Sequence, residues 1–368
     1  MRNKKVLFLV NHDVVIYNFR LELIEKLLAE GYEVHISSPN GEKIKRLINL
    51  GCEFHEIKLD RRGTNILKDA TVLKEYYKLI KKLKPLIVLT YTIKPNIYGG
   101  FISRLLKVPY MSNITGLGSS ISNESNKVLK RILRILYKSS LKKSNCVFFQ
   151  NQANLNSFLK ADIKLRKYKL LPGSGVNVDK FAYTEYPNNE KINIYYFGRL
   201  MKDKGTYELL EAAKILKNKF EKLNIHLVGF SEDNQLTQQI KLYHNENIVI
   251  NHGYQEDIYD YIQQADAVIQ PSYHEGMSNV LLEASSSGRP VLASNIPGCK
   301  EIIDDKITGY LFEVKNVKDI VEKIEAFINL SHSQRSQMGK LARKKMIKEF
   351  SREIVTNAYM EEIELLSK

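Results

Sequence analysis

The sequence predicts an α/β protein with two doubly wound parallel sheets, each in its own domain. Short apolar runs alternate with amphipathic helical stretches along the chain, which is typical of parallel strands covered by helices on both faces. The alternation restarts after Pro172, and 368 residues are enough for two domains. The charge changes at the same point. Residues 1–172 carry 32 Lys and Arg against 13 Asp and Glu, whereas residues 173–368 carry 24 against 28. We therefore expect two domains that face different partners.

Each expected strand of the first half is a short apolar run, and each expected helix repeats apolar residues every three or four positions. The strands are Val6–Val10, Glu33–Ser37, Glu53–Ile57, Leu86–Thr90 and a short one near Tyr110, and the helices are Arg20–Glu30, Gly41–Leu50, 67–83 and 96–106. The first apolar run has only five residues, which is too short for the apolar segment of a signal peptide.

The second half repeats the pattern. Its expected strands are Ile192–Phe197, Ile225–Val228, Ile248–Ile250, Ala267–Gln270 and Pro290–Ala293, with helices at Tyr207–Phe220 and Leu236–Tyr243. Gly173, Gly175 and Pro187 interrupt the periodicity between the halves. We expect an N-terminal domain at 1–172, a linker at 173–190 and a C-terminal domain at 191–349, with a last helix at about 350–368 that packs back on the first domain.

Cysteine usage and hydropathy restrict the class of protein. Cys52, Cys146 and Cys299 are far apart and odd in number, which favours a reducing compartment and argues against disulfides and zinc. The chain has no run of about 18 apolar residues, so no membrane-spanning helix is expected.

A cationic loop follows the first strand of the second half. In residues 196–205, Gly198 lets the chain turn, and Arg199 and Lys204 place two cations before a helix. Ligands bind at the carboxyl ends of strands in such sheets, and two cations beside a helix N-terminus can clamp a diphosphate. The alternative is a loop whose cations are simply solvated.

A second loop, residues 271–283, also follows an apolar strand. Gly276 and Met277 precede Ser278, an expected helix N-cap, and the amide groups of Ser278, Asn279 and Val280 would face an anion. Glu275 and Glu283 are eight residues apart, and a carboxylate accepts hydrogen bonds from sugar hydroxyls. The alternative for Glu283 is an ordinary exposed helical glutamate. A third, weaker candidate is the Gly253-Tyr254 loop, which could border a nucleotide base.

Together these motifs resemble glycosyltransferase family 4. The shared features are Gly-Arg-Leu…Lys-Gly in 198–205, the two glutamates, Gly173-Ser-Gly-Val-Asn177 and Gly298…Glu301…Thr308-Gly309. The match extends from about residue 169 to 323 and more loosely over the whole chain. The resemblance implies the GT-B fold, in which two Rossmann-like domains face a cleft, and transfer of a sugar with retention of anomeric configuration. Segments 91–99 and 115–119 further resemble bacterial enzymes that extend polyprenyl-diphosphate-linked saccharides for capsule, O-antigen or glycan assembly.

The resemblance also implies roles for individual residues. Arg199 and Lys204 would hold the donor diphosphate, Glu283 the ribose and Glu275 the transferred sugar, so that Glu275, Arg199 and Lys204 are the expected catalytic residues. The donor would be a nucleotide sugar, with UDP as the expected nucleotide, and no further cofactor is expected. No metal is expected either, because the cations would stabilise the leaving diphosphate and the chain contains no Asp-x-Asp triplet.

The expected acceptor side lies in the first domain, at His12, Lys94, Asn96, Gly116 and Gly118. Two positions depart from the family. Many members carry a histidine where Thr92-Ile93-Lys94 stands, and a Gly-Gly pair where residues 11–14 read Asn-His-Asp-Val. The resemblance therefore assigns no catalytic group to this domain.

The segment 126–143 predicts a helix with cations on one face, namely Lys127, Arg131, Arg134, Lys138 and Lys142, and apolar residues opposite, namely Leu129, Ile132, Leu133 and Leu136. Such a helix could lie on an anionic membrane surface, or it could be a packed helix with a solvated charged face. If the helix lies on a membrane, and because the expected acceptor is linked to a lipid, we expect the protein in the cytoplasm, bound peripherally to the inner face of the cytoplasmic membrane.

Two other functions fit parts of the pattern. A GT-B nucleotide-sugar epimerase would share the diphosphate clamp but would release sugar and nucleotide without an acceptor. A non-enzymatic protein that binds nucleic acid or another anionic surface would fit the excess of cations. Nucleic-acid binding predicts aromatic residues among the cations of 127–143, where Tyr137 is the single one, so no nucleic-acid partner is expected.

Overall fold

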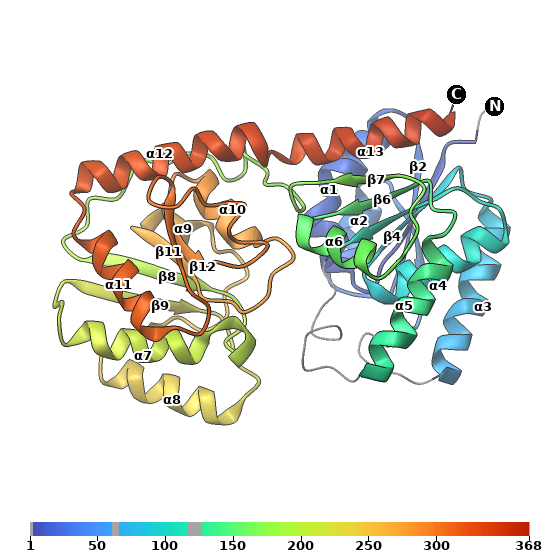
Figure 1. Ribbon diagram of the computed structural model, residues 1–368. Coiled ribbons are helices and arrows are strands. Elements are labelled where there is room, and N and C mark those ends of the chain that lie inside the picture. Colours follow the sequence, from blue (N-terminus) through green and yellow to red (C-terminus); the bar gives the residue numbers. More distant parts are fainter. Residues whose placement is uncertain (1–2, 61–65, 116–126, 368) are drawn as a thin grey trace. The chain divides into compact units, whose positions relative to one another are not determined.

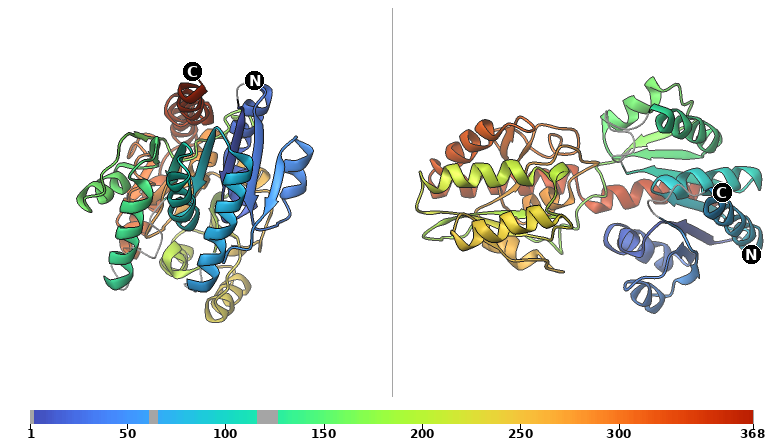
Figure 2. Two further views of the ribbon diagram at one scale, coloured as in Figure 1. Left: turned by 90° about the vertical axis from the view of Figure 1, so that its right-hand side faces the viewer. Right: turned by 90° about the horizontal axis from the view of Figure 1, so that it is seen from below.

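The computed structural model describes residues 3–60, 66–115 and 127–367, which form two compact units. The first unit contains residues 1–174 together with residues 352–368, and the second contains residues 175–351 (Figure 1). Both sheets are parallel with helices on both faces, which confirms the predicted α/β class (Figure 2).

The described part of the first unit contains a seven-stranded parallel sheet in the order β3-β2-β1-β4-β5-β6-β7. Its strands are β1 (Lys5–Leu9), β2 (Glu33–Ser38), β3 (Glu53–Glu56), β4 (Ile87–Tyr91), β5 (Tyr110–Ile114), β6 (Cys146–Phe149) and β7 (Tyr168–Leu170). Its helices are α1 (Asp13–Ala29), α2 (Ile44–Asn49), α3 (Ile66–Leu83), α4 (Ile93–Leu105), α5 (Lys127–Leu141), α6 (Gln152–Lys160) and α13 (Arg352–Ser367).

Strand β1 shows why the apolar runs are continuous. Val6 and Phe8 pack into the core beneath α1 and α13, whereas Leu7 and Leu9 pack into the opposite core with α3. Both faces of the strand are buried from Val6 to Leu9, so these four residues are all apolar.

Helix α1 begins well before the predicted start at Arg20. His12 caps it, since its Nδ1 accepts a hydrogen bond from the amide of Val14 at 3.2 Å. The next residue, Asp13, is buried and accepts a hydrogen bond from the Lys43 amide at 2.8 Å. An imidazole cap and a buried carboxylate lie outside the usual start signals of a helix, and the apolar periodicity alone therefore placed the start too late.

Helix α13 belongs to the first unit. Its Tyr359 ring packs against Phe148 at 4.3 Å between centroids, and its Arg352 forms an ion pair with Glu22 of α1 at 3.0 Å. The last helix of the chain therefore completes the first core.

The described second unit has a six-stranded parallel sheet in the order β10-β9-β8-β11-β12-β13. The strands are β8 (Ile192–Phe197), β9 (Leu223–Val228), β10 (Ile250–Asn251), β11 (Ala267–Gln270), β12 (Val291–Ser294) and β13 (Gly309–Phe312). The helices are η2 (Lys202–Lys204), α7 (Thr206–Lys217), α8 (Asn234–Asn245), α9 (Tyr259–Gln264), α10 (Asn279–Ser286), α11 (Val317–Ile328) and α12 (His332–Glu349).

The predicted linker at 173–190 is wrong for most of its length. Val176, Phe181 and Tyr186 are buried, and the amide of Val176 donates to the carbonyl of Phe350 at 2.8 Å. These apolar side chains are separated by turn residues, so the sequence pattern did not indicate that they belong to the core. The segment from Gly175 onward is therefore part of the second unit.

Each sheet has a point where the strand order reverses direction. In the first sheet it lies between β1 and β4, and in the second between β8 and β11. Crossover helices on the two sides of such a point leave to opposite faces, so a crevice opens at the carboxyl ends of the two strands. Among the residues that the structure describes, no helix is long and apolar enough to cross a membrane.

Candidate functional site

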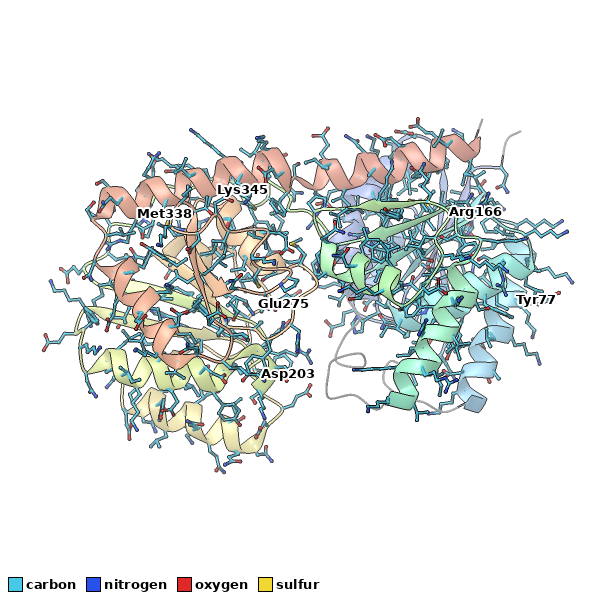
Figure 3. All side chains as sticks on the ribbon, in the orientation of Figure 1. Tyr77, Arg166, Asp203, Glu275, Met338 and Lys345 are labelled. Carbon is cyan, nitrogen blue, oxygen red and sulfur yellow. The ribbon has the colours of Figure 1, made fainter. Side chains whose placement is uncertain are left out.

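The two predicted loops of the second unit meet at its reversal point. Residues 198–205 leave the carboxyl end of β8, and residues 271–278 leave the carboxyl end of β11, which is the neighbouring strand. The loops are joined through their backbones, because the Tyr273 amide donates to the carbonyl of Asp203 at 2.9 Å. Asp203 and Glu275 mark the two loops in Figure 3.

An ion pair forms the centre of this site. Lys204 Nζ lies 2.6 Å from Glu275 Oε1, and the two side chains are only 24% and 13% exposed. Gln270, at the end of β11, lies 3.5 Å from the same carboxylate oxygen and donates to the Ser272 hydroxyl at 2.7 Å. The structure thus joins the predicted cation and the predicted sugar-facing carboxylate.

Gly205 is required for this close approach. Its φ is +68°, and a Cβ atom built there would lie 2.0 Å from the carbonyl oxygen of Pro271. Any side chain would push the two loops apart and separate Lys204 from Glu275. The Lys-Gly part of the motif therefore has a steric cause.

The backbone at Gly198 lies against the end of the neighbouring strand β9, at a position where only a glycine fits. A Cβ atom on Gly229, which follows β9, would lie 1.8 Å from the Gly198 carbonyl oxygen. The Gly229 amide in turn donates to the Gly253 carbonyl at 2.8 Å. Arg199 is exposed, and among the described residues its guanidinium forms no hydrogen bond or ion pair. It is therefore available to an anionic ligand.

The N-terminus of α10 lies beside the ion pair. Ser278 caps the helix, since its hydroxyl accepts from the Leu281 amide at 3.5 Å, and its own amide donates to the Gly298 carbonyl at 2.9 Å. The first amides of a helix lack intrahelical acceptors, so those of Asn279 and Val280 suit an anion. Asn279 Oδ1 is buried with no hydrogen-bond partner among the described residues.

Gly298 holds the loop that carries Glu275. Its φ is +88°, and a Cβ atom there would lie 2.7 Å from the Glu275 carbonyl oxygen. Met277 is buried beneath the loop, and Gly276 and Glu283 are half-buried. Glu283 follows Asn279 by four residues and so occupies the same face of α10.

Two exposed aromatic rings lie next to each other beyond the ends of two strands, Phe230 after β9 and Tyr254 after β10. Tyr254 lies beside Phe230, with an edge-to-face contact of 5.9 Å between ring centroids. Sequence reasoning proposed Tyr254 but missed Phe230, although Phe230 directly follows a strand and a glycine. It also missed Gln270, which reads as the last residue of an apolar strand.

A second hydrogen-bonded pair supports the loop after β11. The Tyr273 hydroxyl donates to Glu208 of α7, and the Lys315 ammonium lies 4.6 Å from the centre of the Tyr273 ring. Burial and the Glu208 carboxylate raise the pKa of Tyr273. Tyr273 therefore stays protonated and keeps its bond to α7.

The predicted acceptor-side residues of the first unit differ in their surroundings. His12 is partly exposed at the carboxyl end of β1, 2.9 Å from Asp13 Oδ1. Lys94 forms an ion pair with Asp69 at 2.7 Å. His12 and the segment of Lys94 follow β1 and β4, the two strands at the reversal point of this sheet. Gly116 and Gly118 lie outside the described residues.

Asn96 is not available to a ligand. It is 1% exposed, accepts from the Thr90 hydroxyl at 2.7 Å and donates to the Asn113 carbonyl at 2.9 Å. A polar residue early in a helix after a strand looks like a site residue, but here it satisfies buried strand groups. Its acceptor-side role is not supported.

The backbone is strained where many family members carry a histidine. Thr92 has a φ of +70° at the junction of β4 and α4, which is a conformation that β-branched residues rarely adopt. Such strain is often kept at functional sites. The junction therefore stays a candidate for contact with the acceptor.

Cys52, Cys146 and Cys299 are buried and form no disulfide bond with one another. Burial raises the pKa of Cys52 to about 11 and of Cys146 to about 12. These thiols are neutral at physiological pH and poor metal ligands. In the described part of the second unit, no three His, Cys, Asp or Glu side chains converge closely enough to hold a metal ion.

Two family models match the chain. Residues 180–345 match the family described as glycosyl transferases group 1, and residues 5–151 match the one described as glycosyl transferase 4-like.

Three curated bacterial proteins are similar over most of their length. The N,N'-diacetylbacillosaminyl-diphospho-undecaprenol alpha-1,3-N-acetylgalactosaminyltransferase of Campylobacter jejuni is 28% identical over 87% of this chain and 88% of that protein. The UDP-Gal:alpha-D-GlcNAc-diphosphoundecaprenol alpha-1,3-galactosyltransferase of Escherichia coli is 28% identical over 72% and 71%. The capsular polysaccharide biosynthesis glycosyltransferase CapM of Staphylococcus aureus is 26% identical over 96% and 95%.

Solved structures show the same fold. A glycosyltransferase from Rickettsia africae has a TM-score of 0.82 at 21% identity and covers 100% of both chains. HepE from Anabaena, solved in complex with UDP and glucose, has a TM-score of 0.77 at 19% identity and covers 98% of both chains.

Proposed function

Since the chain belongs to the group 1 glycosyl transferases and has their GT-B fold, we propose that it moves a hexose or N-acetylhexosamine from a UDP-sugar to a lipid-diphosphate-linked saccharide with retention of configuration. The observation that carries the proposal is the Lys204–Glu275 ion pair at the reversal point of the second sheet. In this pair, a cation that suits a diphosphate and a carboxylate that suits sugar hydroxyls lie 2.6 Å apart.

The cations act on the leaving group. Breaking the bond between the sugar and the nucleotide leaves negative charge on the diphosphate, and Lys204 and Arg199 are the groups that would stabilise it. Without donor, Glu275 balances the charge of Lys204. A bound diphosphate would compete for that ammonium and free Glu275 to accept hydrogen bonds from the sugar.

The remaining residues would position the nucleotide. The amides at the start of α10 suit a phosphate oxygen, and Glu283 suits the ribose hydroxyls. Tyr254 and Phe230 offer aromatic edges to a base. UDP is supported by the name of the Escherichia coli relative and by the nucleotide bound to HepE. A lipid-diphosphate acceptor is supported by the names of two relatives.

A screen of nucleotide sugars tests this function. The protein is incubated with each donor and a polyprenyl-diphosphate-linked saccharide, and nucleotide release and product mass are measured together. We expect a UDP-sugar to release UDP as the acceptor gains one hexose or N-acetylhexosamine. Release of a different nucleotide would show that the assignment of UDP is wrong. No gain in acceptor mass with any donor would contradict the proposal.

We predict that transfer needs no divalent metal, because Arg199 and Lys204 supply the positive charge that a metal would bring to the diphosphate. Activity should be unchanged in excess EDTA. A loss of activity in EDTA that added Mn²⁺ or Mg²⁺ restores would contradict the prediction.

We also propose that α5 binds an anionic membrane surface at the inner face of the cytoplasmic membrane. Its exposed face carries Val128, Ile132 and Ile135 between cations such as Lys127 and Arg131. Ile132 was expected on the apolar face opposite the cations, but its side chain is exposed. Exposed apolar residues among cations are what an interfacial helix presents to lipid.

Two of the expected cations already have partners. Arg134 donates to the Ala161 carbonyl at 2.7 Å, and Lys138 forms an ion pair with Asp162 at 2.8 Å. The hydrogen bond and charge of Lys138 lower the pKa of the Asp162 carboxyl. The exposed cations Lys127, Arg131, Lys142 and Lys143 are therefore the better test set.

Changing Lys127, Arg131, Lys142 and Lys143 together to Gln should release the protein from anionic vesicles, since each cation contributes about 1 kcal/mol near such a surface. Sedimentation with vesicles at low and high salt measures this, because salt screens the attraction. The matched control changes Lys318, Lys340, Lys344 and Lys348 of the second unit, which are also exposed. Equal release of both variants from the vesicles, or vesicle binding that does not depend on salt concentration, would contradict a specific role for α5.

A further inference from the structure

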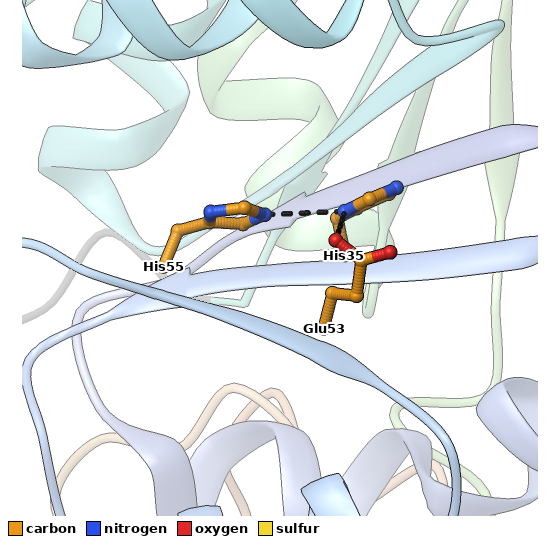
Figure 4. A group of neighbouring side chains, drawn as sticks. All are labelled: His35, Glu53 and His55. Atoms are coloured by element: carbon orange, nitrogen blue, oxygen red, sulfur yellow. Dashed lines mark hydrogen bonds and ion pairs between the residues drawn. The ribbon is translucent and has the colours of Figure 1, made fainter.

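Two histidines and a glutamate converge at the edge of the first sheet. His35 lies on β2, and Glu53 and His55 lie on the edge strand β3. His35 Nδ1 is 3.1 Å from His55 Nε2 and 3.3 Å from Glu53 Oε2 (Figure 4). All three ligand atoms lie within 4.8 Å of one another.

The strand register produces this arrangement. His35 pairs directly with Glu53, and His55 is two residues further along β3, so the three side chains project from the same face of the sheet. Cys52 precedes β3 but packs into the core on the opposite face with Val34 and Ile36. The cluster is thus built from nitrogen and oxygen atoms without a thiol.

These separations match those of ligands on one metal ion. Zinc binds imidazole nitrogen at about 2.0–2.1 Å in a tetrahedron, which places two ligand atoms about 3.3 Å apart. His35 is 1% exposed and Glu53 is 64% exposed, so one ligand is fixed while another can adjust at the surface.

A carboxylate is also placed to support the buried ligand. His35 Nε2 is buried without a hydrogen-bond partner among the described residues, and Glu33 Oε2 lies 3.9 Å from it. Metal-bound histidines commonly donate their other N–H to a carboxylate, which fixes the tautomer. Glu33 also offsets the charge of Lys5, at 3.6 Å.

A second histidine pair provides a natural comparison. In the second unit, His226 Nδ1 lies 2.9 Å from His252 Nε2. There the other nitrogen of His226 is 3.1 Å from Asn193 Oδ1, and no carboxylate completes the group among the described residues. Stacking on Tyr195 at 4.1 Å covers this pair. It is a packed hydrogen-bonded pair without a third ligand.

From this geometry we infer that His35, Glu53 and His55 bind one Zn²⁺ ion, which clips the edge strand β3 to β2. The fourth position of the tetrahedron is left to water. In this inference the role of the ion is to join two strands, because its ligands lie on the paired strands β2 and β3 and outside the predicted donor site of the second unit. The inference is independent of the proposed transfer reaction and compatible with activity in EDTA.

Calorimetry with zinc chloride on chelator-treated protein tests the inference. We expect one zinc ion per chain and, at a hundredfold excess over Kd, a rise in Tm of about 5–10 °C. Glu53→Gln and His55→Gln each remove a ligand near the surface and should weaken binding by at least about tenfold. The matched control His252→Gln should bind zinc as the wild type does.

Each variant is first checked by circular dichroism in EDTA, so that a folding defect is separated from a lost ligand. Absence of saturable zinc binding would overturn the inference. So would wild-type affinity in both Glu53→Gln and His55→Gln, or loss of the zinc ion in His252→Gln.

Discussion

Replacing Lys204 by methionine should lower kcat for sugar transfer by about 100- to 1,000-fold, which is the usual effect of removing one group that stabilises developing negative charge. Lys204 is held at the reversal point of the second sheet by a 2.6 Å ion pair and by a glycine that no other residue can replace without a clash. Methionine keeps the length of the side chain and removes its charge. Steady-state kinetics with donor and acceptor measure the effect.

Lys202→Met is the matched control, because Lys202 is an exposed lysine on the same short helix. Its kcat should remain within a few-fold of the wild type. The double variant Lys204→Met/Glu275→Gln tests whether an unpaired, largely buried Glu275 destabilises the single variant. Thermal unfolding of all three separates stability from catalysis. Equal losses of kcat in Lys202→Met and Lys204→Met would contradict a specific role for Lys204.

Substitutions of Glu275 and Glu283 should have different effects on UDP binding. Glu283→Ala should weaken the affinity for UDP by about 10- to 150-fold, because the ribose hydroxyls would lose the charged acceptor that the proposed function assigns to them. Glu275→Ala should bind UDP at least as tightly as the wild type, since it releases Lys204 from its ion pair. The same change should lower kcat, because the proposed function assigns Glu275 to the hydroxyls of the transferred sugar. Calorimetry with UDP alone, followed by kinetics, measures both effects.

Glu322→Ala, on the exposed face of α11, is the control and should change neither quantity. A similar loss of UDP affinity in Glu275→Ala and Glu283→Ala would contradict the separate roles. Weaker UDP binding in Glu275→Ala alone would instead mean that the ion pair with Lys204 organises the diphosphate site.

The sheets could be predicted because their strands are apolar on both faces. Val6, Leu7 and Phe8 are all buried, and such runs are distinct from amphipathic helices. The starts of the helices and the bounds of the domain linker were harder to predict from the sequence. The start of α1 depends on an imidazole cap, and residues such as Phe181 become part of a core only through contacts far along the chain.

The loops of the candidate donor site could be located in the sequence because they follow strands directly and include glycines and charges. Their pairing could not, since the Lys204–Glu275 contact spans 71 residues and depends on the packing of two backbones. Asn96 shows the opposite error. Polarity in a loop-to-helix segment suggested a ligand, but the neighbouring strands use its hydrogen bonds. Burial decides between the two roles, and it is a property of the folded chain.

The most direct test of the transferase assignment is UDP release from the preferred UDP-sugar, measured with and without a lipid-diphosphate-linked saccharide, with product mass determined in the same samples. We predict that release depends on the acceptor and equals, mole for mole, the acceptor that has gained one sugar. Acceptor-independent release of UDP together with free or epimerised sugar, and no change in acceptor mass, would contradict a transferase and identify an epimerase.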